Sequence, residues 1–217
     1  MKKALLICGL AIGCLANTAA AQTDAKAKGI LENVSKKVNT LKTIKANFTL
    51  KITGGKGGKV SDTKKGNISL KGQKYHFMIS GQEVICDTKT IWNYNADAKE
   101  VTINNFNPNE QNISPAKLLT NFYEKEYKYK YTGERKEGGK TCDVIELTPI
   151  DASKQTSKIE LLIDKANSMI AGGTMWSKNG NKTQYEISNV VTNTNIPDTY
   201  FTWDAKAHKG VEVNDMR

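Results

Sequence analysis

Histidine is scarce in this chain. Its 217 residues include only two histidines, His76 and His208. Neither accompanies a carboxylate pair, a glycine-rich phosphate loop or a nucleophile elbow, which are the arrangements that acid–base, phosphoryl-transfer and nucleophilic enzymes need. His76 lies between Tyr75 and Phe77, where a core or outward-facing strand histidine is the simpler interpretation. We therefore expect no enzymatic activity, no catalytic residue, no metal site and no cofactor.

Arginine is also scarce, although the chain is basic. Arg135 and Arg217 are the only arginines among 32 basic residues, and the formal net charge is +10. The planar guanidinium suits forked contacts with bases and phosphates, whereas lysine presents a compact point charge. We therefore expect no nucleic-acid partner. The lysines either solvate the outer surface and blunt strand edges, or they steer the protein toward an anionic membrane or an acidic docking surface.

Long apolar runs are absent except near the start of the chain. The run Ala4–Ala16 follows two lysines and precedes Ala19 and Ala21, at the spacing that signal peptidase prefers. We predict a signal peptide over residues 1–21. Because no later segment approaches eighteen consecutive apolar residues, we expect residues 22–217 to form one exported, soluble domain in the periplasm.

Cysteine is limited to four positions. Cys8 lies within the first apolar run, and Cys14 follows a small residue, so lipid attachment at Cys14 is an alternative to cleavage after Ala21. Cys86 and Cys142 remain in the predicted mature chain, in a compartment where disulfides persist. They either form a disulfide or are two separate buried thiols.

What the sequence has in abundance is strand-like alternation. Ile44–Thr53 alternates apolar and polar residues with period two and is the clearest strand. The stretch Gly81–Phe106 contains three short apolar runs joined by short polar turns. Such short connections join antiparallel neighbours, because a parallel crossover needs a dozen or more residues. The centre of the chain is therefore predicted to be an antiparallel sheet.

Other segments extend this sheet and add two helices. We predict eleven strands in all, in one antiparallel sheet that curls into a barrel or half-barrel. Apolar residues at helical spacing predict a helix over 24–41, and Ser114-Pro115 begins a second helix that runs to Glu126. The further strands are Ile68 to Gly72, Lys74–Ser80, Tyr127–Tyr131, Cys142–Leu147, Ile159–Asp164, Met169–Ser177 and Lys182–Thr192.

Alternation also predicts a sheet with one apolar and one polar face. A curved sheet of this kind lines its concave face with hydrophobic side chains. Either these side chains fill the interior, or an apolar cavity remains under a helical cover. The second predicted helix is either a movable lid or a fixed closure of one barrel end.

Four stretches resemble one protein family. The run DTKTIWNYN at Asp87–Asn95 resembles the D-G-K-T-x-W-x-Y-N centre of the periplasmic outer-membrane lipoprotein carrier proteins, the Lol-type carriers. Leu41–Lys51 is similar to the first strand of that family. Asn195–Trp203 resembles its D-x-x-F-x-F stretch, and Lys209–Asp215 resembles its P-x-G-V-x-V-x-D tail. The shared order of these motifs spans nearly the whole mature chain.

The resemblance implies a fold and a function. The fold is an unclosed eleven-stranded antiparallel barrel covered by an α-helical lid. The function is that of a monomeric carrier that takes lipoproteins from an inner-membrane ABC transporter to an outer-membrane acceptor or receptor, and binds their acyl chains in an apolar cavity. A lipid- or lipoprotein-sensing module, or a carrier of another amphiphile, is the alternative on the same fold. The candidate acyl-chain contacts are Ile44, Phe48, Leu50, Ile68, Leu70, Phe77, Trp92, Leu118, Leu119 and Phe122.

One position departs from the family pattern. Where the family carries Arg-Pro after the first hairpin, and the arginine holds the lid closed, this chain has Lys71-Gly72-Gln73. Lys71 is then the candidate lid-gating residue. An ammonium cannot make the forked contacts of a guanidinium, so its gating would differ from that of the family.

Overall fold

The computed structural model describes residues 24–54, 59–107 and 123–217. Its helices are α1 (Ala25–Asn39), α2 (Tyr123–Glu126) and the 3-10 helix η2 (Asp198–Phe201). Its strands are β1 (Ile44–Thr53), β2 (Val60–Lys71), β3 (Lys74–Ile79), β4 (Gln82–Cys86), β5 (Thr90–Asn95), β6 (Glu100–Asn105), β7 (Tyr127–Glu137), β8 (Lys140–Pro149), β9 (Thr156–Asp164), β10 (Met169–Ser177), β11 (Lys182–Thr192) and β12 (Glu212–Asp215).

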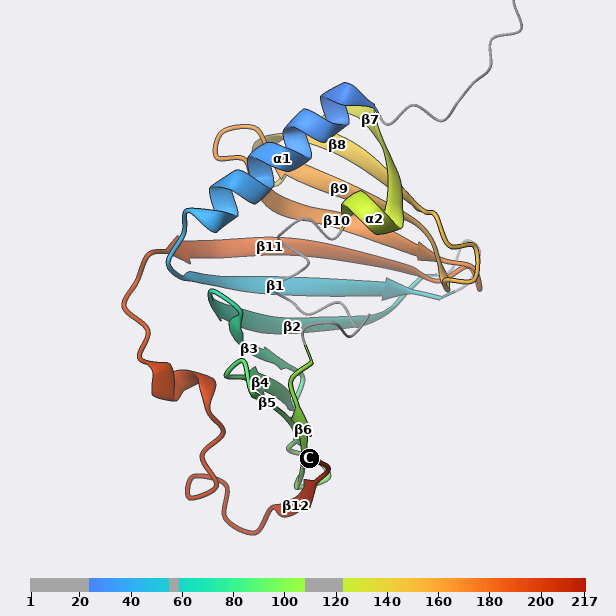
Figure 1. Cartoon of the computed structure of the whole chain (residues 1–217). Coiled ribbons are helices and arrows are strands. Elements are labelled where there is room, and N and C mark those ends of the chain that lie inside the picture. Colours follow the sequence, from blue (N-terminus) through green and yellow to red (C-terminus); the bar gives the residue numbers. More distant parts are fainter. Residues whose placement is uncertain (1–23, 55–58, 108–122) are drawn as a thin grey trace, which may run out of the picture.

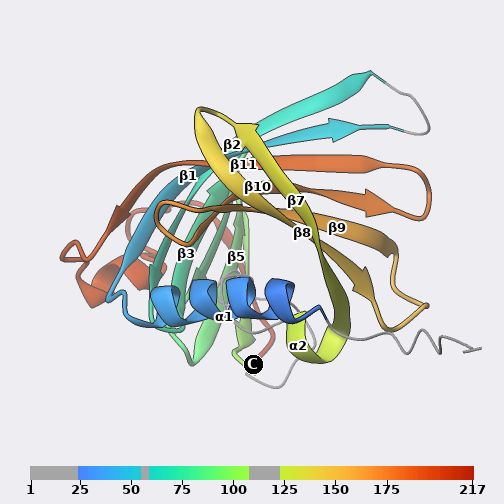
Figure 2. The same cartoon turned by 90° about the horizontal axis from the view of Figure 1, so that it is seen from above.

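All the described strands belong to one curved sheet. Their order is β12-β6-β5-β4-β3-β2-β1-β11-β10-β9-β8-β7, and the two edge strands β12 and β7 are not paired with each other. The sheet therefore curls without closing, as the view from above shows (Figure 2). The expectation of an unclosed, mainly antiparallel half-barrel is confirmed.

One strand lies beyond the eleven that were predicted. β12 has four residues and pairs in parallel with β6, from Glu212↔Glu100 to Asp215↔Ile103. Its sequence, EVND, is too short and polar to show alternation. The pairing arises because the long segment after β11 runs past β3–β6 and returns to the far edge of the sheet (Figure 1).

Helix α1 covers the inside of the curve on one side of the sheet. Asp24 is its N-cap, because Oδ1 accepts hydrogen bonds from the backbone N–H groups of Lys26 and Ala27 at 2.9 and 3.2 Å. The second carboxylate oxygen accepts from the N–H of Tyr131 at 2.9 Å, which fixes the start of α1 to the edge strand β7. These bonds hold the helix across β7–β10 (Figure 2).

The apolar stripe of α1 forms the main core with the concave face of the sheet. Leu31 and Val34 are buried there against Leu147 and Leu161. A separate cluster lies on the opposite, convex face, where Ile85 and Val101 pack against Trp203. The chain after β11 thus covers the outer face of β4–β6, while α1 covers the inner face of β7–β10.

Most of the predicted elements are confirmed. The helix expected over 24–41 is α1, and β1, β10 and β11 have the predicted bounds. β2 begins at Val60, well before the predicted Ile68. Of the helix predicted from Ser114 to Glu126, only Tyr123–Glu126 falls within the described residues, and it is helical. The predicted signal peptide, with Cys8 and Cys14, lies outside them.

No helix in the described ranges is long and apolar enough to cross a membrane.

Cys86 and Cys142 are separate thiols, and the disulfide alternative is wrong for this structure. Cys86 on β4 and Cys142 on β8 are both free and fully buried. Six strands stand between β4 and β8 in the sheet order, and the two side chains pack in different apolar clusters. Burial raises the pKa of both thiols, which disfavours the reactive thiolate.

Candidate functional site: an apolar face on the central strands

The antiparallel register gathers most of the predicted acyl-chain contacts on one face. Ile44 pairs with Leu70, and Ala46 with Ile68, across β1 and β2. Ile68 in turn pairs with Phe77 of β3. Six of the predicted residues, Ile44, Phe48, Leu50, Ile68, Leu70 and Phe77, therefore share the concave face of β1–β3.

Pairing on the other side of β1 shows that this is the face that α1 covers. Phe48 pairs with Ile187, and Leu50 with Tyr185, on β11. Ile187 and Tyr185 pack against the core cluster that includes Leu31 of α1. The candidate site and the helix-covered core are thus one continuous apolar surface.

Trp92 does not belong to this surface. It pairs with Ile85 on β4 and with Ile103 on β6, and it packs in the convex cluster around Trp203. Its neighbour Ile91 pairs with Cys86 and takes the concave position of β5. Side chains alternate along a strand, so only one of the two can face inward. Trp92 was predicted to contact an acyl chain, but it does not lie on the surface that the other six residues share.

Lys71 also faces outward, away from the apolar surface, and its role in lid gating stays a prediction because residues 108–122 lie outside the described ranges. Leu70 takes the concave position, and Lys71 the convex one. The Lys71 ammonium donates to the carbonyl oxygen of Ile196 at 2.9 Å and to Asp198 Oδ1 at 2.7 Å. Lys71 therefore holds the segment after β11 against the outer face of the sheet. Leu118, Leu119 and Phe122 lie outside the described residues.

Two glycines shape the site, and both escaped sequence reasoning. Gly66 is the β2 partner of Phe48, and the Phe48 ring lies over it. A β-carbon at position 66 would stand 2.3 Å from Phe48 Cζ. Gly173 is the β10 partner of Tyr185, and a β-carbon there would stand 2.6 Å from the Tyr185 hydroxyl oxygen. Each aromatic ring lies flat on the strand beside it because that strand offers no side chain at that position.

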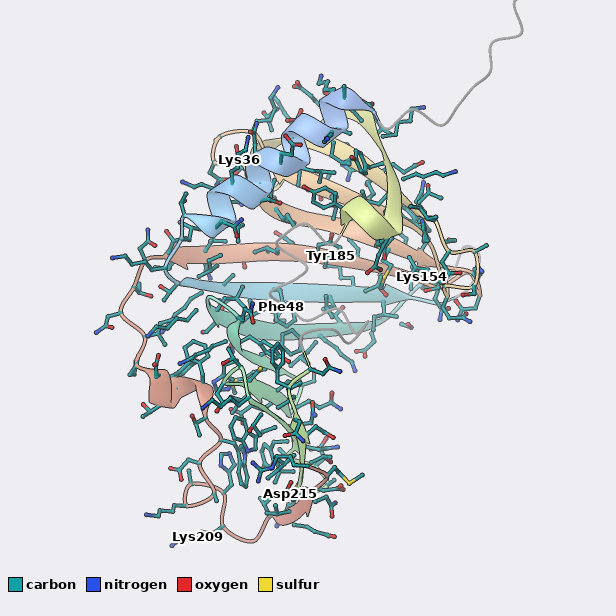
Figure 3. The ribbon with its side chains drawn as sticks, in the orientation of Figure 1. Lys36, Phe48, Lys154, Tyr185, Lys209 and Asp215 are labelled. Carbon is teal, nitrogen blue, oxygen red and sulfur yellow. The ribbon has the colours of Figure 1, made fainter. Side chains whose placement is uncertain are left out.

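The two rings lean in opposite directions. Phe48 projects from β1 toward β2, and Tyr185 projects from the neighbouring strand β11 toward β10. Figure 3 shows both residues near the middle of the molecule. Between them, Leu50 and Ile187 are only half-buried. We call these four residues, Phe48, Leu50, Tyr185 and Ile187, the central strip.

Phe77 extends the apolar surface away from the strip. Its ring stacks on Phe48 with centroids 5.0 Å apart and an interplanar angle of 6°. Offset stacking of this kind adds about 0.5–1.5 kcal/mol to the burial of the rings. The Phe77 ring, on the β3 side, holds the Phe48 ring in place over Gly66.

Charged groups lie beside the strip, with Lys64 on the β2 side and Glu160 of β9 near Tyr185. Lys64 of β2 pairs with Leu50 in the register, and its ammonium lies 3.8 Å from Asp62. Tyr185 is the one titratable member of the strip, and burial together with the nearby Glu160 raises its pKa far above the ordinary value. The strip is therefore neutral at ordinary pH, and its chemistry is that of an apolar binding surface.

Comparison with known proteins supports the same fold. The family described as outer membrane lipoprotein carrier protein LolA matches residues 39–204, more than half of the chain. No curated protein sequence matches the chain.

Solved structures share this architecture at low sequence identity. An uncharacterized conserved protein from Thermus thermophilus superposes with a TM-score of 0.62 at 12% identity, over 88% of this chain and 99% of that one. A chain of the MucA/MucB complex of Pseudomonas aeruginosa superposes with a TM-score of 0.51 at 14% identity, over 84% of this chain and 62% of that one. These likenesses establish the fold, and the family match establishes the lineage: the chain belongs to the family of the outer membrane lipoprotein carrier protein LolA.

Proposed function

We propose that this protein is a periplasmic carrier that binds the acyl chains of lipoproteins on the central strip and the apolar surface around it. The observation that carries the proposal is the opposed lean of Phe48 and Tyr185. Two large rings fold down onto glycines, and half-buried Leu50 and Ile187 remain between them. A filled core would use those rings to cover such side chains. Here they border an apolar surface that an alkyl chain can cover.

The energetics suit a carrier that must release its cargo. Each buried methylene contributes about 0.8 kcal/mol, so a fully enclosed sixteen-carbon chain gains about 12 kcal/mol. A chain that lies on one curved sheet, in contact along one side, gains about half of that. Binding of this strength is reversible, and a second apolar surface can compete for the chain.

Family membership supports the remaining steps of the proposed transport, from export of the protein to delivery of its cargo. We infer that residues 1–21 direct export, that the cargo comes from an inner-membrane ABC transporter, and that an outer-membrane acceptor receives it. We also infer that the protein acts as a monomer without enzymatic activity. A sensing module is the second candidate, because the fold is shared with a chain of the MucA/MucB complex, in which the structure holds two proteins together.

A charge placed on either face of β1 tests the binding surface. Leu50→Asp puts a carboxylate in the strip, whereas Asn47→Asp puts the same group on the exposed outer face of the same strand. We expect Leu50→Asp to weaken binding of a synthetic diacyl lipopeptide at least ten-fold, because a bound acyl chain would bury the carboxylate, and pairing with Lys64 across the strands repays only part of that cost. Asn47→Asp should bind like the wild type. Equal binding by two folded variants would refute the assignment.

The cargo class is tested by what co-purifies with the protein from periplasm. Mass spectrometry should find acylated proteins if the protein carries lipoproteins. Free lipid without acylated protein would favour a carrier of another amphiphile.

The predicted helix Ser114–Glu126 supplies the movable cover in this proposal. Amide hydrogen exchange across 115–126 should be faster than across β1 in the empty protein, and should slow when lipopeptide binds. Protection equal to that of β1 in the empty protein would make the helix a fixed element.

A further inference from the structure

The hydroxyl of Tyr185 is a hydrogen-bond donor on the apolar strip, with Glu160 as the nearby charged residue. Its side chain is half-buried, and within the described part of the chain no group forms a hydrogen bond with the hydroxyl. The ring lies over Gly173, and its neighbours in the register and core are Leu50, Ile187 and Met175. A ligand that covers this hydroxyl takes it out of water, which is costly unless the ligand offers it an acceptor.

The Tyr185 hydroxyl also keeps its proton. Burial and the nearby carboxylate of Glu160 both raise the pKa of Tyr185. The group therefore remains a neutral O–H donor at ordinary pH. An uncharged acceptor of hydrogen bonds suits it best.

Polarity changes along β1 at the level of Tyr185. The cross-strand row one step nearer the start of β1 holds Ile187, Phe48 and Gly66, which carry no side-chain polar atom. The next row toward the end of β1 holds Tyr185, Leu50 and Lys64. Beyond it, Ile52 stands between Thr183 and Asp62. The surface is thus mainly apolar toward Ile44, where Thr192 is the β11 partner, and becomes polar from Tyr185 onward.

An acylated ligand has the same distribution of polarity. Its hydrocarbon tail carries no polar atom, and the first acceptor after the tail is the ester or amide carbonyl. The gradient along β1 therefore orients such a ligand, with the tail toward Ile44 and the headgroup toward the Lys64 end of the strip. In that orientation the carbonyl reaches the level of Tyr185.

We propose that Tyr185 donates a hydrogen bond to the acyl carbonyl of the bound chain and so makes the site selective for acyl esters and amides over other alkyl compounds. The proposal rests on the proposed function, because it assumes that alkyl chains occupy the central strip. It adds the chemical group that the strip recognises and the direction in which the chain lies.

Two lipopeptides that differ only in their linkage test this proposal. One is a diacyl lipopeptide with a free N-terminus, in which the acyl carbonyls are esters. The other is the dialkyl ether analogue of equal chain length, which has the same peptide but no acyl carbonyl. The wild type should bind the ester about five-fold more tightly, the ratio expected for one additional hydrogen bond in an apolar site.

Tyr185→Phe removes the donor but keeps the ring on Gly173. We expect this variant to lose affinity for the ester, to keep the wild-type affinity for the ether, and so to bind the two equally. Tyr131→Phe is the matched control, because it removes a phenol from β7, where Lys26 lies 3.6 Å from the ring centroid. This control should retain the five-fold ratio.

The possible failures are distinguishable. A wild type that binds ester and ether equally, or a Tyr185→Phe variant that keeps the preference, overturns the role of Tyr185 and leaves the carrier function intact. A wild type that binds neither lipopeptide overturns the proposed function itself.

Discussion

Phe48 lies across Gly66, with Cζ 2.3 Å from the position that a β-carbon at residue 66 would occupy. The backbone carbonyl oxygen of Met78 lies 2.2 Å from the same position on the other side. The glycine is therefore held between a ring and a neighbouring strand. Its missing side chain is what allows Phe48 to lean away from β11 and leave Leu50 and Ile187 half-buried.

Gly66→Ala should consequently be destabilising. The added methyl group meets backbone on β3, which cannot move without breaking strand pairing, so Phe48 and β2 must both shift. We expect a loss of roughly 1–3 kcal/mol in the free energy of unfolding, the usual cost of overpacking. Urea unfolding followed by tryptophan fluorescence measures it.

Gly29→Ala is the matched control for that substitution. Gly29 lies in the middle of α1, and no atom stands within 4 Å of a β-carbon there. Alanine at a helical position of this kind should stabilise by about 0.5–1 kcal/mol. A Gly66→Ala variant as stable as the wild type would show that the Phe48 ring is not held in place over Gly66.

Alternation predicted the strands and the faces of their residues well, because it is a local property. Both ends of the ten-residue strand β1 were predicted correctly, and Ile44, Phe48 and Leu50 lie on the predicted face. The same rule did not decide between Ile91 and Trp92, which are adjacent apolar residues. Only the pairing Cys86↔Ile91, set by the neighbouring strand, places Trp92 outside.

The positions of Gly66 and Gly173 beneath the two aromatic rings could not be predicted for a related reason. Whether Gly66 stands opposite Phe48, and Gly173 opposite Tyr185, depends on the register between strands. A glycine in a strand signals a close approach of some other group, but sequence does not say which group. The contacts of Lys71 were not predicted because its partners, Ile196 and Asp198, follow it by more than 120 residues and reach it across the outer face.

Lys71→Met should loosen the outer segment and leave cargo binding unchanged. The ammonium of Lys71 contacts both Ile196 O and Asp198, whereas the ammonium of Lys74 contacts Asp198 alone, at 2.9 Å. These two lysines lower the pKa of Asp198 to about 2, so its carboxylate is charged throughout the ordinary pH range. Amide exchange over 196–203 should therefore accelerate more in Lys71→Met than in the control Lys74→Met. Because both lysines are partly exposed, global stability should fall by less than about 1 kcal/mol.

A result that contradicts this interpretation is easy to recognise. If Lys71→Met changes lipopeptide affinity several-fold and leaves exchange over 196–203 unaltered, the residue acts on the binding surface after all.

Cys86 and Cys142 should each react as a free thiol once the protein is unfolded. Both are fully buried on strands far apart in the sheet. Without reductant, iodoacetamide should alkylate the peptides that contain them in urea and should leave both unmodified in the native protein. A cross-linked peptide pair in the digest would contradict the structure.

The hydrogen bond between His76 and Glu83 should make stability fall in acid. The two ring nitrogens of His76 face Glu83 and the carbonyl oxygen of Tyr200, the latter at 3.0 Å, so the histidine joins β3, β4 and η2. The hydrogen bond with His76 lowers the pKa of Glu83 below its ordinary value of 4.5, and the nearby His208 lowers it further. A carboxyl group whose pKa is lower in the folded state stabilises the protein fully above the unfolded pKa, and that contribution disappears as the pH falls through the folded pKa.

Glu83→Gln tests this linkage through the difference in unfolding free energy between wild type and variant from pH 3 to pH 7. The gap should be about 1–2 kcal/mol near pH 7, because a charged hydrogen bond in a largely buried place is lost. It should narrow steadily below pH 4.5, where the wild type also loses the charge. Glu134→Gln removes an exposed carboxylate that pairs with Lys165, and should open a smaller gap, since solvent screens that pair. A gap for Glu83→Gln that is independent of pH would mean that the side chain stabilises the outer face by packing and not through its charge.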